Sequence, residues 1–484
     1  MDLRLSEDIL HFYENSRMLA ILIIAIYALA AICAVRELMN SRTAQGSIAW
    51  LLSLIILPFP TAFLYLIFGW KFLGDYAELQ TFSGRKNRAQ RVREMGIADE
   101  ITSSEWPVLS NITQMPFLSG NKSELLIDGE ATFKSIFEGI IAAKTSILVQ
   151  FYTIKNDSLG KKLAQILVEK ANAGLNVMVL YDDIGSSGLS KNYISLLKQA
   201  GVEVNAFNQR HKFLRIYGPM RINFRNHRKI VVVDNETAWV GGHNVSNDYL
   251  GKNPKFGDWR DTHICVCGPA ALACALVFRE DWEWATGEKL KLEPPKTKAT
   301  KGDEAVLVMP TGPADMLEDC AIAFSEVISR ARKRLWIVSP YFVPGIDVQT
   351  ALYAAALRGV EIRILLPKKA DHMMVWLASY AHADQMLDHG IPIYRYNKGF
   401  LHQKIILVDD EIAGVGTVNF DNRSFSINFE VTLWFTHKRM ISSIEKMLIN
   451  DFSNSNKTTT YELETRPLWF RVAAQIARLF SPVL

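Results

Sequence analysis

The amino-acid sequence predicts a layered α/β protein made of one fold repeated twice and preceded by a pair of membrane-spanning helices. Two observations predict the repeat: strand and helix patterns recur in the same order, and the motif HRKIVVVD at 227–234 returns as HQKIILVD at 402–409. Two uncharged apolar runs near the start predict the helix pair. A chain of 484 residues is long enough for two or three domains.

Residues 1–70 are predicted to form an N-terminal membrane hairpin. Met18 to Val35 and Ile48 to Trp70 carry no charge, and each is long enough to cross a bilayer core as a helix. Pro58 and Pro60 can break or kink the second helix. Two buried helices of a soluble core are disfavoured because a polar face is missing, and a cleaved signal peptide because no small-residue cleavage pattern precedes the second run.

Basic residues predict that the long C-terminal part faces the cytoplasm. Arg36 and Arg42 are the cations between the two runs, whereas many more follow the second run. Those that follow are Lys71, Arg85, Lys86, Arg88, Arg91 and Arg93. Residues 71–120 are accordingly predicted to be a basic juxtamembrane linker that can attract anionic headgroups.

Segments 121–295 and 296–484 are predicted to be the two copies of the repeated domain. In the first copy, SILVQFY, GKKLAQILVEKANAGLNVMVLYDD and GVEVNAF indicate a strand, a helix with a strand, and a short strand. In the second copy, RLWIVSPYFV, TALYAAALRGVEIRILLP and GIPIYRY follow in the same order. Strands alternating with helices indicate a layered α/β domain, and internal duplication is the simplest explanation.

The first copy carries an insertion directly before its motif. Apolar residues alternate there with cations and no acid is present, which favours a lipid-headgroup contact over a solvated basic loop. The cations are Arg210, Lys212, Arg215, Arg221 and Arg225.

The repeated motif contains side chains suited to attack on a phosphorus ester. Residues i and i+2 of a strand share one face, so His227 points with Lys229 and His402 with Lys404. One imidazole can act as nucleophile while lysine holds the phosphoryl oxygens. The other can protonate the leaving alcohol and later deprotonate the incoming one.

Two amides and two acids complete the predicted site. Small-residue stretches after each motif end in Asn244 and Asn419, which a returning strand would bring beside the histidine and lysine as phosphate ligands. Asp261 and Glu430 occupy matching positions in the two copies, and they are the candidates for fixing the histidine tautomers.

The motif aspartates, Asp234 and Asp409, belong to the catalytic set by their place in the motif. Each stands where a strand gives way to a turn, so turn formation or a structural salt bridge is favoured over catalysis. The remaining histidines share no such spacing, and most are predicted to be surface or packing residues: His11, His211, His243, His263, His372, His382, His389 and His437.

Neither a cofactor nor a metal is predicted. The sequence contains no Walker-type glycine loop and no His-Glu-x-x-His pattern. Cys265 and Cys267 lack a matching second pair, so buried strand positions are favoured over zinc. Five cysteines form no regular framework, which favours reduced thiols and a reducing compartment. The formal net charge of +4 is no nucleic-acid signature.

The chain resembles the phospholipase D superfamily, whose mark is two copies of H-x-K-x4-D-x6-G-[small]-x-N. Within it, the chain is similar to the bacterial cardiolipin synthases over nearly its whole length, including WRDTHICVCGPAA, SPYFVPG and FLHQKIILVDDEIAGVGTVNFDNRSFSINFE. It departs from the usual pattern at Gly242, where serine is commoner, and at Gln150, where relatives usually have glutamate.

The resemblance implies two α/β/α sandwich domains packed as a pseudo-dimer around one active site. It also implies metal-independent transfer between two phosphatidylglycerol molecules through a phosphohistidine, giving cardiolipin and glycerol. His227 is the nucleophile and His402 the acid and base by analogy, and the reverse assignment stays open. The expected location is the bacterial cytoplasmic (inner) membrane, multi-pass, with the active site facing the cytoplasm; a homodimer is a further expectation left open.

The C-terminal RPLWFRVAAQIARLFSPVL predicts an amphipathic helix that lies on the membrane or docks on the body, with the first favoured. Three other functions are weighed. A lipase producing phosphatidic acid fits the same motif. A nuclease is disfavoured by the membrane hairpin and by the lack of a broad basic surface. A non-enzymatic membrane scaffold does not explain two intact motifs.

Overall fold

The computed structural model contains two compact units, Met1–Phe72 with Arg210–Phe224, and Leu73–Gln209 with Arg225–Leu484. The second unit is called the body below. The residues described are 2–39, 44–69, 88, 90–97, 101–102, 105–207, 224–293, 302–315, 317–369, 371–458 and 461–484.

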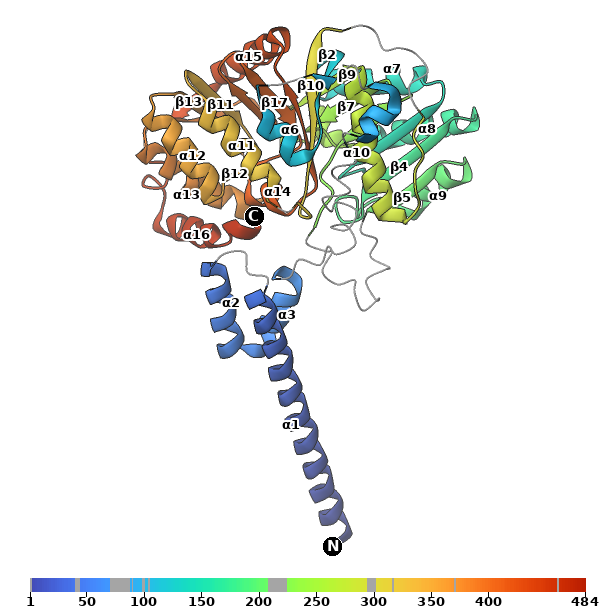
Figure 1. The fold of residues 1–484 in the computed structure, drawn as a ribbon. Coiled ribbons are helices and arrows are strands. Elements are labelled where there is room, and N and C mark those ends of the chain that lie inside the picture. The colour runs from blue at the N-terminus through green and yellow to red at the C-terminus, as the bar shows by residue number, and fades with distance from the viewer. Residues whose placement is uncertain are drawn as a thin grey trace. The chain divides into compact units, whose positions relative to one another are not determined.

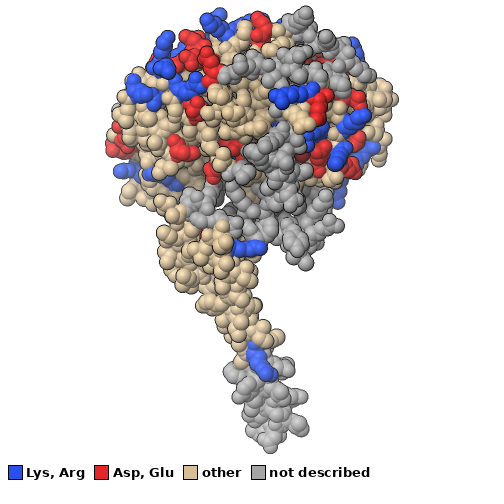
Figure 2. All heavy atoms as spheres, viewed as in Figure 1, with Lys and Arg blue, Asp and Glu red and all other residues tan. Residues whose placement is uncertain are grey.

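The N-terminal unit has one helix long enough to cross a membrane. Helix α1 (Asp2–Met39) includes the 25-residue stretch Asn15–Met39, within which an 18-residue window has a mean hydropathy of 2.9. Among the described residues it alone meets the length and composition of a membrane span. On the face seen in Figure 2, the described part of this unit is mostly uncharged.

The second apolar run is not the single helix predicted for residues 48–70. It forms α2 (Ala44–Ile56) and α3 (Pro58–Phe68), of 13 and 11 residues, and Leu57 separates them. Pro58 lacks an N–H and cannot continue a helix, so it begins α3 instead. At about 1.5 Å per residue, each helix spans roughly 20 Å or less, short of a bilayer core of about 30 Å.

The body is built on a 16-stranded sheet. Its first half contains β2 (Phe117–Ile127), α7 (Asp128–Ala142), β3 (Ser146–Phe151), α8 (Ser158–Asn172), β4 (Asn176–Asp182), α9 (Lys191–Gln199), β5 (Glu203–Phe207), β6 (Ile230–Val233), β7 (Thr237–Gly241), β9 (Thr262–Cys267) and α10 (Pro269–Thr286). Short elements are β1 (Ile101–Thr102), α6 (Pro107–Thr113) and β8 (Trp259–Arg260). Helices cover both faces of the sheet (Figure 1).

The second half of the body also alternates strands and helices. It contains β10 (Glu304–Thr311), α11 (Asp319–Arg330), β11 (Arg334–Val338), α12 (Ile346–Leu357), β13 (Glu361–Pro367), α13 (Met373–Asp388), β14 (Ile393–Tyr396), β16 (Ile405–Val408), β17 (Ile412–Gly416), β19 (Glu430–Phe435), α15 (Lys438–Ser453), β20 (Ser455–Thr458) and α16 (Leu468–Leu479). Short elements are β12 (Phe342–Val343), β15 (Phe400–Leu401), β18 (Phe420–Asp421) and α14 (Asn422–Ser426).

The strands follow the same order in the two halves of the sheet, counted outward from its centre. Outward from the centre, the first half reads β2-β9-β7-β6-β3-β4-β5 and the second reads β10-β19-β17-β16-β11-β13-β14. The pairing senses also match, since β3 is parallel to β4 and antiparallel to β6, as β11 is to β13 and β16. Strands β2 and β10 pair antiparallel and join the halves into one sheet.

The predicted linker 71–120 is wrong at its C-terminal end. Helix α6 and the start of β2 lie within it, and Trp106 and Leu109 are buried, so the body begins before residue 121. Arg88, counted among the headgroup-attracting cations, is also buried and pairs with Glu280 at 2.7 Å. The residues from 70 to 87 lie outside the part of the chain that is described.

Candidate active site

The two motifs occupy equivalent places in the sheet. His227 and Lys229 lead directly into β6, and His402 and Lys404 lead into β16. Each strand then pairs antiparallel with its successor, β7 or β17, which ends just before Asn244 or Asn419. All four motif side chains are buried, with exposures between 0% and 9%.

Each histidine is held by the acid of the other half. His227 Nδ1 lies 3.0 and 2.9 Å from the two carboxylate oxygens of Glu430. His402 Nδ1 lies 2.7 Å from Asp261 Oδ2. Both acids are fully buried, so each carboxylate fixes the hydrogen on Nδ1 and leaves Nε2 of its partner histidine with the lone pair.

Main-chain pairing between the halves produces this crossing. Strand β15, just before His402, is parallel to β8, just before Asp261, and the His402 N–H donates to the Arg260 carbonyl at 2.8 Å. On the other side, the His227 N–H donates to the Phe429 carbonyl at 2.9 Å. Each histidine segment therefore runs beside the segment that carries the acid of the opposite half.

The small residue of each motif, Gly242 or Thr417, lies against the acid of its own half, Asp261 or Glu430. Thr417 Oγ1 donates to Glu430 Oε2 at 2.5 Å in the second copy. In the first copy a Cβ added at Gly242 would lie 2.0 Å from Asp261 Oδ1, so a side chain at this position would clash with the carboxylate. The Gly242 departure thus accommodates the Asp261 side chain beside His402.

The lysines place two cations beside the imidazoles. Lys229 Nζ donates to the His227 carbonyl at 2.6 Å, and Lys404 Nζ lies 2.8 Å from His402 Nδ1. Since one Nδ1 cannot donate to Asp261 and also accept from lysine, we assign its hydrogen to the charged Asp261 contact. Burial lowers the pKa of Lys404 to about 8 against the opposing charges of Asp261 and Glu430, and burial holds the pKa of Lys229 well below its ordinary value.

Both imidazoles are neutral near pH 7. Burial lowers the pKa of His227 to about 4, although Glu430 opposes the shift. Burial and the Lys404 charge hold the pKa of His402 well below its ordinary value. One neutral imidazole suits a nucleophile, and an anionic phosphodiester bound between the motifs would favour a proton on the other.

The two asparagines are placed differently. Asn244 Oδ1 accepts from the Thr153 N–H at 3.0 Å, and its amide donates to the Tyr249 hydroxyl at 2.5 Å. Asn419 is 5% exposed, and its Oδ1 has no hydrogen-bond partner among the described residues. Asn244 therefore positions Tyr249, whereas Asn419 Oδ1 accepts no hydrogen bond from a described residue.

Aromatic rings around the histidines were missed by sequence reasoning. Tyr152 lies edge-on to His227, with ring centroids 5.2 Å apart. Trp259 and Tyr249 pack on His402 at 5.2 and 5.7 Å. Trp259 lies two residues before Asp261 in the stretch WRDTHICV. This closeness in sequence to a candidate orienting acid is the signal that could have predicted a tryptophan beside the site.

The motif aspartates stand apart from the histidines. Asp234 accepts from the backbone N–H groups of residues 144–146, and Asp409 accepts from those of residues 332–334. Each follows a four-residue strand of roughly 13 Å that separates it from its histidine. This placement corrects their inclusion in the catalytic set: they fix the turns before β3 and β11.

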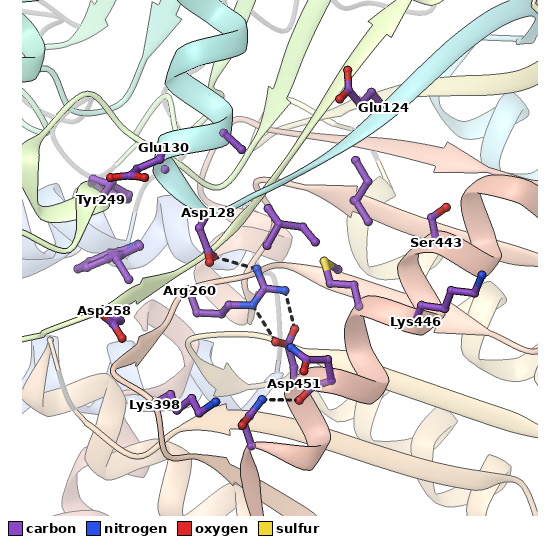
Figure 3. A pocket seen from close by; sticks show the side chains of 18 of the residues that line it. Glu124, Asp128, Glu130, Tyr249, Asp258, Arg260, Lys398, Ser443, Lys446 and Asp451 are labelled. Carbon is purple, nitrogen blue, oxygen red and sulfur yellow. Dashed lines mark hydrogen bonds and ion pairs between the residues drawn. The ribbon is translucent and has the colours of Figure 1, made fainter.

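Two buried ion pairs hold the backbone at the crossing. Arg228 pairs with Asp281 at 2.6 Å and donates to the main-chain carbonyls of Glu430 and Thr311. Gln150, at the second departure, donates to the same Asp281 at 2.6 Å. In the other copy Arg260 pairs with Asp451 at 2.7 Å and with Asp128 at 2.9 Å, as Figure 3 shows.

Asp281→Asn is expected to destabilise the body by about 3–5 kcal/mol, because it removes the buried carboxylate that pairs with the Arg228 guanidinium. Arg228 and Asp281 are 1% and 0% exposed. Chemical denaturation in detergent, followed by tryptophan fluorescence, measures this loss.

Asp410→Asn is the matched control, since Asp410 pairs with Arg334 but is 72% exposed. Its expected cost is less than about 1 kcal/mol. Equal losses in the free energy of unfolding from the two substitutions would contradict the stabilising role assigned to Asp281.

The remaining predicted positions, and one acidic cluster that was not predicted, lie outside the set of acids, lysines and aromatic rings that contact the motif histidines, or outside the described residues. Arg210, Lys212, Arg215 and Arg221 lie outside the described residues, whereas Arg225 is half-buried and its carbonyl accepts from the Phe429 N–H. His243 and His263 form a buried packing pair, with Nδ1 atoms 3.1 Å apart. An ion could fit between Asp303, Glu304 and His437, whose ligand atoms lie close together. A guanidinium nitrogen of Arg439, however, already pairs with Glu304 Oε1 at 2.5 Å.

Buried histidines predict that stability falls in mild acid. Burial lowers the pKa of His227 to about 4 and those of His243 and His263 to about 3. The unfolded chain, with histidine pKa near 6.5, binds more protons below that pH, so stability is full above about pH 6.5 and is lost toward pH 4. The thermal unfolding midpoint in detergent is expected to fall steadily between pH 7 and pH 5.

The exposed His372 supplies the control, since His372→Gln is expected to leave this slope unchanged. A midpoint that is level between pH 7 and pH 5 would contradict the neutral, buried state assigned to these histidines.

A cavity of about 1330 Å³ lies next to the site without containing it. It is lined by Tyr249, Trp259, Arg260 and Asp451, among others (Figure 3). None of His227, Lys229, His402 and Lys404 is among its lining residues. The cavity therefore approaches His402 from behind the aromatic rings that pack on it.

Comparison with known proteins places the chain in a family. The family described as "Cardiolipin synthase, PLD-like domain" matches residues 136–255 and 324–452, and "Phospholipase_D-nuclease N-terminal" matches residues 23–70. Cardiolipin synthase A of Pseudomonas entomophila is 40% identical, covering 98% of this chain and 100% of the relative. That of Pseudomonas fluorescens is 41% identical with the same coverage. The chain belongs to the bacterial cardiolipin synthases of the phospholipase D superfamily.

A solved structure supports the fold. Phosphatidylserine synthase from Haemophilus influenzae superimposes with a TM-score of 0.57 at 16% identity, covering 82% of this chain and 100% of the other. At this identity the similarity concerns the mixed α/β architecture.

Proposed function

We propose that the chain synthesises cardiolipin by moving a phosphatidyl group from one phosphatidylglycerol to another through a phosphohistidine. The observation that carries the proposal is the crossed arrangement, in which Glu430 holds His227 and Asp261 holds His402 beside two buried lysines. The names of the cardiolipin synthase relatives support the choice of lipid.

In the first step, His227 Nε2 attacks the phosphorus of one phosphatidylglycerol. Glu430 holds Nδ1–H and stabilises the charge that forms on the ring, and Lys229 and Lys404 bind the phosphoryl oxygens. The P–O bond to the headgroup breaks as His402 gives its proton to the glycerol oxygen. The products are phosphatidyl-His227 and free glycerol.

In the second step, His402 takes the proton from the terminal hydroxyl of a second phosphatidylglycerol. That oxygen attacks the phosphorus, the P–N bond breaks, and cardiolipin leaves with His227 restored. One phosphodiester replaces another, so the reaction needs no energy source. The lysines supply the positive charge that phosphoryl transfer requires, which supports a metal-independent mechanism without a cofactor.

The assignment of nucleophile to His227 rests on two supports. One is the resemblance to superfamily relatives. The other is geometry, since both Glu430 oxygens approach Nδ1 of His227, whereas Nδ1 of His402 has one Asp261 oxygen and the competing Lys404 ammonium. His227 and His402 are 9% and 6% exposed, which restricts water and favours an alcohol acceptor over hydrolysis.

We further propose that the body is a duplicated pair of α/β/α sandwich domains that pack as a pseudo-dimer, the first extending from α6 to residue 295 and the second covering 296–484. The matching strand order and pairing senses support this. The apolar helix α1 would anchor the protein in the bacterial inner membrane, with the active site in the cytoplasm. The cations after the second apolar run support this orientation.

The purified chain should be incubated in vesicles that contain phosphatidylglycerol as the only phospholipid, with chelator present. Cardiolipin and glycerol in equal amounts would support the proposal. Phosphatidic acid with glycerol, and no cardiolipin, would make the protein a hydrolase, which is the second candidate function. Absence of both products, from protein that unfolds cooperatively, would refute both.

A further inference from the structure

Helix α16 has an inner face docked on the body. Phe470, Ala474 and Ala477 are buried, and Phe470 packs edge-on against Trp376 and Tyr380 of α13 at 5.6 and 5.4 Å. These contacts fix how the helix is turned about its axis, and therefore which side chains face outward.

The opposite face of α16 is apolar and exposed. Exposed fractions between 49% and 79% belong to Leu468, Trp469, Val472, Ile476, Leu479 and Phe480. A contiguous set of large apolar side chains exposed to water is unfavourable and usually marks a binding surface. We call these six residues the outer face.

The charges on α16 are all of one sign. The helix contains Arg471 and Arg478 and no acid. Apolar side chains, an exposed tryptophan and cations without acids are the features of helices that lie at the boundary of lipid headgroups and acyl chains. We propose that the outer face of α16 inserts into a lipid bilayer and that Arg471 and Arg478 contact anionic headgroups.

A bilayer fits this surface better than a second copy of the chain. Two α16 helices packed face to face would bring four guanidinium groups together with no acid on either helix to offset them. A bilayer, by contrast, is already implied by the apolar stretch Asn15–Met39 in the same chain. The inference stands on the surface itself and does not rest on the proposed reaction.

The helix is also connected to the second motif. Just after α16, the Ser481 and Leu484 carbonyls accept hydrogen bonds from the Asn422 amide at 2.9 Å and from the Arg423 N–H at 2.8 Å. Asn422 and Arg423 open α14, three residues after Asn419. Hydrogen bonds therefore join the end of the chain after α16 to the segment that follows the second motif.

The test places a bimane label on Val472→Cys in the full chain, reconstituted into vesicles that contain doxyl-labelled lipid. The matched control is Lys161→Cys on the exposed side of α8. The parent chain serves as the blank, because five native cysteines are present. Doxyl lipid is expected to quench the label at 472 at least about threefold more than the label at 161, and more strongly still when anionic lipid is included.

Two results would overturn the inference. Equal quenching at 472 and 161, with both labels open to aqueous iodide, would mean that the outer face stays in water. A label at 472 that is shielded from iodide but not quenched by doxyl lipid would mean that protein covers the face, such as a second copy. Neither result depends on turnover, so failure of the proposed function would be seen separately in the lipid product assay.

Discussion

His227→Ala is expected to abolish cardiolipin formation, with a fall in turnover of about 10⁴-fold or more, because the attacking nitrogen is removed and neither Lys229 nor Glu430 can replace it. The lipid products from phosphatidylglycerol vesicles measure this loss. The covalent lipid–protein adduct should disappear along with turnover, since no phosphatidyl group can be accepted.

The matched control for this substitution is His372→Ala, a histidine that is exposed. It should keep parental turnover. If His227→Ala retained more than about one hundredth of parental turnover in a folded protein, the nucleophile would have to be sought elsewhere, with His402 the first alternative.

His402→Ala is expected to lower turnover by about 10²- to 10⁴-fold, the range for loss of a general acid and base. Glycerol would leave without a proton donor, and the second alcohol would attack without a base. Because the second step is blocked as well, phosphatidyl groups that reach His227 should stay there. Phosphatidylglycerol labelled in its phosphate, followed by separation of the protein, measures this adduct.

Substitution of the orienting acids provides the control for the crossed geometry. Asp261→Asn should resemble a weaker His402→Ala, and Glu430→Gln a weaker His227→Ala, because each acid contacts the histidine of the other half. If Asp261→Asn prevented formation of the adduct while Glu430→Gln allowed it to accumulate, the assignment of the two histidines would be reversed.

Local patterns in the sequence were sufficient to locate the candidate site. The period of two along a strand placed His227 with Lys229, and alignment of the two copies identified Asp261 and Glu430, which lie against the histidines. The order of strands and helices within each half also follows the predicted order. These features depend on neighbours along the chain, so a single sequence reveals them.

Features that depend on contacts between distant segments were not predicted. Which acid serves which histidine is set by pairing between β8 and β15 and by the main-chain contact of His227 with Phe429. Arg88 is cationic and lies near the membrane runs in sequence, yet Glu280, 192 residues away, draws it into the body. No pattern along the chain records such a partner.

In the N-terminal unit, a pattern of neighbouring residues led to a wrong prediction. Composition alone indicated an uncharged second run, but Pro58 divides it into α2 and α3. The missing N–H of Pro58 therefore prevented the single helix that hydropathy had indicated. The body shows a mixed distribution of acids and bases on the face seen in Figure 2, which agrees with the absence of a strong net charge.

The most direct test of the central claim is to find the residue that carries the phosphatidyl group. His402→Ala protein exposed to phosphatidylglycerol should be quenched, digested under neutral conditions that preserve phosphohistidine, and analysed by mass spectrometry. The phosphatidyl adduct is expected on the peptide that contains His227. An adduct on another residue, or parental turnover of the wild-type chain with no adduct detectable in any variant, would contradict that claim.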